Sequence, residues 1–226
     1  MIPLELPDEP RWVEAHGIAA DPESWRLPVG DGFALGHDRM RLIVVAGDAD
    51  PGALVTFARQ HAQHTLLVTS DELAAALRRA GRSVERALLH TLPDPALLPD
   101  LDGAVPLAGD LPPGPDAGPL ADEIAYARSR GATVWTVYVD DAPASFAYVP
   151  WRSRRWFDVS VDTLPQARQL GLGAIVASAM IRDELGRGRA PVWGADEHNL
   201  ASLALARKLG FQSIDEIFVS SPSSSP

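Results

Sequence analysis

The chain has 226 residues, of which 46% are hydrophobic and 22% charged, and its formal net charge is −10. This is the composition of a globular protein with a sizeable core, and the negative charge disfavours nucleic acid as the main partner. The chain contains no cysteine, which excludes disulfides, thiolate metal ligands and a cysteine nucleophile.

Residues 1–40 show no clear pattern of helix or strand. They begin with acidic residues and prolines, where a signal peptide would have a basic and then an apolar region. No apolar stretch of the chain reaches the ~18 residues that span a bilayer. We therefore expect a cytoplasmic protein without a membrane partner.

Strands and helices alternate through the next part of the chain. Asp50 followed by Pro51 is typical of a helix start, and Thr69 with Glu72 forms a capping box for the following helix. This order predicts a small α/β unit with parallel pairing over residues 1–103. The predicted elements are strands within 41–50, 64–70 and 83–90, and helices over 51–62 and 71–80.

The second part opens with proline-rich segments, which predict a boundary near residue 100 and a surface loop near 110–118. A helix over 119–131 is then followed by three strands that predict an antiparallel meander. The remaining predicted elements are a helix to about residue 185, a strand over 190–195, a helix over 198–210 and one or two strands over 211–220.

Two glycines open the helix that follows the meander. Gly171 and Gly173 lie in the stretch ARQLGLGAIVASAM and follow Arg168 by three and five residues. The first turn of a helix presents unpaired N–H groups and the positive end of its dipole, and glycine lets an anion approach the backbone. The stretch predicts a phosphate site with Arg168 at its rim, and tight helix packing is the alternative. A dinucleotide-binding motif is disfavoured, because Val176 occupies the third glycine position.

Two spaced motifs resemble the GCN5-related N-acetyltransferase (GNAT) superfamily. The first is Arg-x-x-Gly-x-Gly at residues 168–173, with Pro165 three residues before it. The second is Asn-x-x-Ser-x-x-Leu-x-x-Lys-x-Gly-Phe, which starts at Asn199, and the chain is most similar to a branch with Pro-x-Trp on the fifth strand. The resemblance is specific over residues 133–219.

The resemblance implies an α/β fold with a mixed sheet: a GNAT acetyltransferase domain at 104–219, after the unit at 1–103 and before a Ser/Pro tail at 220–226. It implies that the strand with Val161 diverges from the strand with Trp193, near Asp158. Acetyl-CoA would place its pantetheine arm along the first strand and its pyrophosphate on the glycine loop. The residues assigned to the cofactor in this way are Val161, Asp162, Thr163, Arg168, Gln169, Leu170, Gly171, Leu172, Gly173, Asn199 and Ser202.

The catalytic groups follow less directly. Asp158 alternates with the apolar residues Phe157 and Val159 on its strand, beside the diverging strands, and is our choice for the general base. The tyrosine that often serves as general acid in the superfamily is replaced by Ala206, and Tyr138 and Tyr148 are candidate substitutes. We predict no metal site, because no third ligand follows the histidines at 61 and 64.

The leading hypothesis is an acetyl-CoA-dependent N-acetyltransferase that acts on a small-molecule amine through direct attack in a ternary complex; a homodimer stays open. The alternative from another class is a coenzyme A-binding module without catalysis, which Ala206 favours. A third hypothesis is acyl transfer to an oxygen nucleophile or of a longer acyl group.

Overall fold

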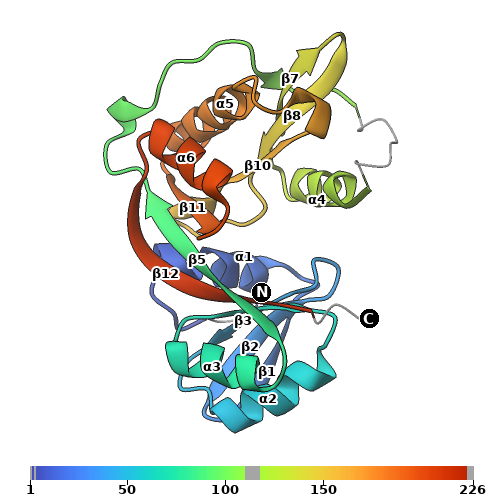
Figure 1. The fold of residues 1–226 in the computed structure, drawn as a ribbon, viewed down its shortest axis with the longest axis vertical. Helices are drawn as coiled ribbons and strands as arrows, with labels where there is room; N and C mark the ends of the chain where they lie inside the picture. The colour runs from blue at the N-terminus through green and yellow to red at the C-terminus, as the bar shows by residue number, and fades with distance from the viewer. Residues whose placement is uncertain (1, 3, 110–117, 223–226) are drawn as a thin grey trace. The chain divides into compact units, whose positions relative to one another are not determined.

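The computed structural model of the protein describes residues 2, 4–109 and 118–222 (Figure 1). Residues 110–117 of the predicted loop and residues 223–226 of the predicted tail lie outside the described residues. The contacts divide the chain into two compact units. The first consists of Met1–Leu89, Ala195–Asn199 and Ile214–Pro226, and the second of His90–Gly194 and Leu200–Ser213. The predicted domain boundary at residue 103 stays a prediction.

The first unit is built on a mixed sheet with the strand order β1-β2-β3-β4-β12-β5. Only β3 and β4 of its first four strands are parallel to each other, whereas β12 pairs with β4 in the antiparallel sense. The helices and strands are α1 (Val13–Ala20), β1 (Trp25–Val29), β2 (Gly32–His37), β3 (Leu42–Ala46), α2 (Pro51–Gln60), β4 (Thr65–Val68), α3 (Asp71–Arg79), β5 (Ser83–Thr91) and β12 (Gln212–Ser221), the last two running on into the second unit.

Alternation along the strands gives this sheet two buried faces. Ile43 and Val45 of β3 belong to the core that also holds Leu54 of α2 and Leu77 of α3. Figure 1 shows α2 and α3 together against this sheet. Leu35 of β2 is also fully buried, and α1 contacts β2. The sheet is therefore covered on more than one side.

Several predictions for this unit need correction. Residues 1–40 hold α1 and the β1–β2 hairpin, which we did not predict. The expected parallel pairing is wrong beyond β3 and β4, because β12 lies between β4 and β5. The cap of α3 is Ser70, whose side chain accepts a hydrogen bond from the Leu73 N–H at 3.3 Å, and not Thr69.

The start of the predicted tail is also wrong. Ser220 is buried in β12, and its hydroxyl accepts a hydrogen bond from Arg82 Nε at 2.7 Å. Ser221 ends the same strand. The cap of α2 is confirmed, since the Asp50 carboxylate accepts from the Ala53 N–H at 2.7 Å.

The second unit contains a four-stranded antiparallel sheet with the order β10-β8-β7-β6. Helix α5 contacts β7, β8 and β10, while α4 shares a core with Phe146 and Tyr148 of β8. Its helices and strands are β6 (Val105–Pro106), α4 (Gly118–Ser129), β7 (Trp135–Val139), β8 (Ala142–Tyr148), β9 (Trp156–Asp158), β10 (Ser160–Thr163), α5 (Leu172–Gly186), β11 (Ala190–Asp196) and α6 (Leu200–Lys208).

The predicted meander is confirmed for β7, β8 and β10, which pair in the antiparallel sense. The third predicted strand is interrupted at Val159, however, and its first half, β9, pairs with β11 in parallel. The mixed α/β fold class is confirmed.

Candidate functional site

The interruption at Val159 separates two strands that start out together. β9 pairs with β11 as far as Asp158 opposite Val192, and the Val159 N–H donates to the Val192 carbonyl at 3.0 Å. From Ser160 onward the chain pairs with β8, and β10 forms the edge of the four-stranded sheet. The predicted divergence is therefore confirmed, and one backbone edge of β10 is left for another extended chain.

A short loop leads from β10 to helix α5. The Arg168 Nε donates to the Thr163 carbonyl at 3.2 Å and so ties the middle of the loop to the end of β10. Gln169 and Gly171 have φ angles of 65° and 80°. Gly171 is the N-cap of α5 and provides no side-chain cap. The Ala174 N–H donates to the Gly171 carbonyl at 3.1 Å, so the first-turn groups offered to an acceptor are the N–H groups of Leu172 and Gly173.

The two glycines are required for different reasons. Gly171 adopts the left-handed conformation, and a Cβ added there would meet no atom within 4 Å. At Gly173 a Cβ would lie 3.3 Å from Leu205 Cδ2 on α6, 3.5 Å from Val161 Cγ1 and 3.6 Å from Thr163 Oγ1 on β10. Gly173 is thus a position where the absence of a side chain keeps the space between β10 and α6 open.

A group of oxygen atoms lies on the other face of β10. The Tyr148 hydroxyl is 2.7 Å from Glu123 Oε2 on α4 and 3.1 Å from Asp162 Oδ2 on β10. Burial, more than any other cause, raises the pKa of Glu123 and of Asp162. Tyr148 is itself fully buried, and burial raises its pKa well above the usual range.

Asp158 ends β9 at the point of divergence. Burial raises the pKa of its carboxyl to about 7, with a smaller contribution from the negative charge of Glu123, whereas a hydrogen bond from the Val159 N–H opposes the rise. A carboxyl that exchanges its proton near neutrality meets the requirement for a general base.

The remaining predicted residues lie in different surroundings. Trp193 packs in the core, and its indole N–H donates to Ser202 Oγ at 3.0 Å, which joins β11 to α6. Ala206 is fully buried, and Tyr138 is 41% exposed on β7. Leu170 is exposed on the loop. Asn199 groups with the first unit, and its assignment to the cofactor stays a prediction.

Glu123 is the one member of this group that we did not predict. It follows Leu120 by three residues and precedes Ala127 by four, and both of these belong to or pack on the core beneath α4. That spacing places Glu123 at the edge of the apolar stripe, where the residue as a whole is exposed but its carboxylate reaches the Tyr148 hydroxyl. An acidic residue at the edge of an apolar stripe was thus the available signal.

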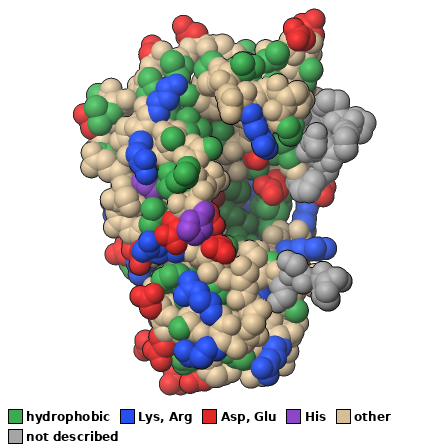
Figure 2. Space-filling view, in the orientation of Figure 1, with side chains coloured by type: hydrophobic (Ala, Val, Ile, Leu, Met, Phe, Trp, Pro, Cys, Tyr) green, Lys and Arg blue, Asp and Glu red, His purple; other side chains and the backbone are tan. Residues whose placement is uncertain are grey.

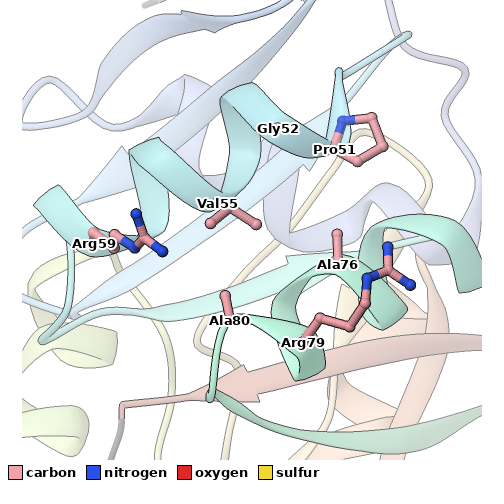
Figure 3. A pocket seen from close by; sticks show the side chains of 7 residues that line it. All are labelled: Pro51, Gly52, Val55, Arg59, Ala76, Arg79 and Ala80. Atoms are coloured by element: carbon pink, nitrogen blue, oxygen red, sulfur yellow. The ribbon is translucent and has the colours of Figure 1, made fainter.

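The first unit holds a pocket that is separate from the predicted site residues. A shallow pocket of about 260 Å³ between α2 and α3 has an apolar floor and two arginines, and it contains none of the predicted site residues (Figure 3). Its lining consists of Pro51, Gly52, Val55, Arg59, Ala76, Arg79 and Ala80. Basic and acidic side chains are interspersed over the face shown in Figure 2.

Among the residues that the structure describes, two groups in the first unit have metal-type ligands close together. They are Asp21, Glu23 and His37, and Glu85, Asp196 and His198. In the first group, His37 Nδ1 accepts a hydrogen bond from the Met40 N–H at 3.3 Å, so the neutral ring carries its hydrogen on the nitrogen that points to Asp21. A ring in that tautomer has no lone pair for a metal at this nitrogen.

Comparison with protein families gives a match over the segment that contains the candidate site. The model of the GNAT acetyltransferase family matches residues 135–218, the segment that contains the diverging strands, the glycine loop, α5 and α6. Residues 135–218 are a GNAT acetyltransferase domain. The protein is accordingly an acyltransferase, and GNAT acetyltransferases generally take acetyl-CoA as the acyl donor.

Solved structures support this fold over nearly the whole chain. A GCN5-related N-acetyltransferase-like protein from Streptococcus suis 89/1591 has a TM-score of 0.65 at 16% identity, over 94% of this chain and 98% of the other. A GCN5-related N-acetyltransferase from Kribbella flavida has a TM-score of 0.62 at 18% identity, over 95% of each chain. A tandem GNAT protein from the clavulanic acid biosynthesis pathway has a TM-score of 0.52 at 16% identity, over 96% of this chain and 95% of the other.

Because these alignments extend well beyond the GNAT domain, the N-terminal part of the chain belongs to the shared fold as well. A search among curated protein sequences finds no significant match. Among the described residues, none of the helices combines the length and apolar character needed to cross a membrane.

Proposed function

We propose that the protein is an N-acetyltransferase that transfers the acetyl group of acetyl-CoA to the amine of a small molecule in a ternary complex. The observation that carries this proposal is the position of Asp158, a carboxyl with a pKa of about 7, at the end of β9, where the chain leaves β11 and continues as β10. The proposal places the donor on one side of this point and the acceptor amine on the other.

The donor side fits coenzyme A in three respects. The edge of β10 at residues 161–163 offers backbone groups to the amides of the pantetheine arm. The uncapped start of α5, with Gln169, Leu170 and Leu172 around Gly171, offers N–H groups to the pyrophosphate. Arg168 uses one of its five N–H groups for the Thr163 carbonyl, which leaves others for a phosphate. Bound acetyl-CoA would supply the activated acetyl group as a thioester.

On the acceptor side, Asp158 has the role of base. An alkylammonium ion must lose one proton before its nitrogen can attack, and the Asp158 carboxylate accepts that proton. The nitrogen then bonds to the acetyl carbon, and the bond between this carbon and the coenzyme A sulfur breaks. The nitrogen releases its second proton to solvent, and the departing thiolate takes one up from solvent. We assign no protein acid to that last proton: Ala206 has none, and the Tyr148 hydroxyl hydrogen is engaged with a carboxyl group. A thiolate leaving group makes such an acid dispensable near neutral pH.

The lack of an evident acid favours a second candidate, a coenzyme A-binding module that does not catalyse transfer. A panel of small amines with acetyl-CoA, read out as release of free thiol, separates the two. We expect transfer to at least one amine and its loss in Asp158→Asn. Binding of coenzyme A without thiol release from any amine would favour the module, whereas transfer only to alcohols would favour the oxygen-nucleophile alternative.

A further inference from the structure

The Tyr148 hydroxyl has more acidic partners than a single hydrogen can satisfy. A phenol donates one hydrogen and can accept others. Glu123 Oε2 at 2.7 Å and Asp162 Oδ2 at 3.1 Å are both within hydrogen-bond distance, and the Ser160 side chain also hydrogen-bonds the hydroxyl. If both carboxyls were ionised, one of them would face a phenolic oxygen without a hydrogen between the two.

One additional proton removes this conflict. A protonated carboxyl donates its hydrogen to the Tyr148 oxygen, and the Tyr148 hydrogen goes to the other carboxyl. Two neighbouring carboxyls that share a site in this way titrate as a pair, with one proton held more tightly than usual. Burial acts in the same direction, because it raises the pKa of both Glu123 and Asp162.

We propose that Tyr148 is a positioning residue, through whose hydroxyl Glu123 and Asp162 share one proton beside Asp158. The inference rests on the proposed function only in the role given to Asp158. It assigns the pair to the acceptor-side face of β10, and it removes Tyr148 from the candidates for the general acid, since its hydrogen belongs to the pair.

The pair influences Asp158 through its charge. The titratable or charged groups that act here come from four segments: Glu123 on α4, Tyr148 on β8, Asp162 on β10 and Arg168 on the loop, which lowers the pKa of Asp162. The charge of Glu123 raises the pKa of Asp158. Sharing a proton reduces that charge, so the pair sets how readily Asp158 ionises.

The variants have effects of opposite sign on Asp158. Glu123→Gln removes the nearby charge and should lower the pKa of Asp158. Asp162→Asn gives the Tyr148 hydrogen to Glu123 alone, leaves Glu123 fully ionised and should raise the pKa of Asp158. If the pair only contributed to folding, the two variants would shift the pKa of Asp158 in the same direction or not at all.

The test is the titration of the carboxyl groups by NMR in protein labelled with ¹³C at the Asp and Glu carboxyls, with each signal assigned from its Asn or Gln variant. In the wild type we expect one member of the pair to titrate well above its ordinary range. In Glu123→Gln, the pKa of Asp162 should fall by about one unit or more, which is the usual scale of coupling between such sites. When Tyr148→Phe is also present, Glu123→Gln should no longer change the pKa of Asp162.

Tyr138→Phe is the matched control, because it removes an equivalent hydroxyl from the exposed face of β7 and should leave the coupling intact. The inference is overturned if Glu123→Gln leaves the titration of Asp162 unchanged, or moves it equally in the presence and absence of the Tyr148 hydroxyl. These measurements need no activity. A protein that acetylates no amine would therefore refute the proposed function and leave the shared proton to be decided separately.

If transfer is observed, the acid limb of the kcat/KM profile gives a second readout. It should move to lower pH in Glu123→Gln and to higher pH in Asp162→Asn. If the acid limb moved equally and in the same direction in the two variants, the pair would not control the ionisation of Asp158, even if it does share a proton.

Discussion

Valine at position 173 tests both the packing and the donor site. An added Cβ would lie 3.3 Å from Leu205 Cδ2, which is already tight, and the two Cγ atoms of valine must enter the same space between Leu205 and Val161. Overpacking of this kind costs about 1–3 kcal/mol, against a gain of a few tenths of a kcal/mol in helix propensity over glycine. For a chain of 226 residues, this corresponds to a melting temperature lower by roughly 2–10 °C.

The same side chain should interfere with coenzyme A. It occupies the space between β10 and α6 and crowds the start of α5, where the pyrophosphate is proposed to accept N–H groups. Loss of two charge-assisted hydrogen bonds, at about 1.5–3 kcal/mol each, weakens binding by about two orders of magnitude or more. In the wild type, a ligand at 100 times its Kd adds about 2.7 kcal/mol of stability, and the variant should lose this increment.

The assay is thermal unfolding with and without coenzyme A, with calorimetric titration for Kd. Gly186→Val is the matched control: it changes the same residue type at the end of the same helix, where a Cβ meets no atom within 4 Å. It should keep both stability and binding. Wild-type affinity in Gly173→Val would refute the donor site, and an equal loss of stability in Gly186→Val would refute the packing explanation.

The remaining predictions concern Asp158 and the cap of α3. Asp158→Asn should lower kcat/KM by about 10²–10⁴-fold above pH 7 and remove the acid limb near pH 7, since only the ionised carboxyl accepts a proton; a pH profile unchanged from wild type would return Asp158 to a structural role. The raised pKa of Asp158 also means that the folded protein loses stability as pH rises from the ordinary aspartate pKa through about 7. Asp158→Asn should therefore have a higher melting temperature than wild type at pH 8 and nearly the same melting temperature at low pH, as calorimetry at the two pH values would show. Ser70→Ala should cost about 1 kcal/mol in urea unfolding, whereas Thr69→Ala should cost much less; the reverse order would restore the predicted capping box.

Local signals in the sequence were sufficient for much of the second unit. The Arg168–Gly173 motif marks the start of α5, because the left-handed N-cap position is one that favours glycine and Gly171 occupies it. The divergence of the strands was predicted from the family resemblance. Its place near Asp158 followed from the same resemblance, but the interruption of the strand at Val159 was not predicted, because alternation continues through this residue without any turn residue.

The first unit was harder to predict for physical reasons. Helix α1 is apolar over most of its surface, and five of its eight residues are buried, so no one-sided stripe marks it. Strand β1 contains Pro28 and exposes three consecutive residues, which obscures the alternation expected of a strand. The position of β12 depends on contacts between residues more than a hundred positions apart, which no local pattern encodes.

The insertion of β12 between β4 and β5 has a consequence for synthesis on the ribosome. The strands up to β5 emerge early, but the strand that separates β4 from β5 lies at the C-terminal end of the GNAT domain and is made only after nearly all of that domain has been translated. Until then both β4 and β5 expose unpaired edges, which are prone to pairing with other chains. The nascent N-terminal part therefore waits for residues 212–221 to complete its sheet, and ribosomes stalled before that point would carry an aggregation-prone intermediate even though every residue of β1–β5 is already present.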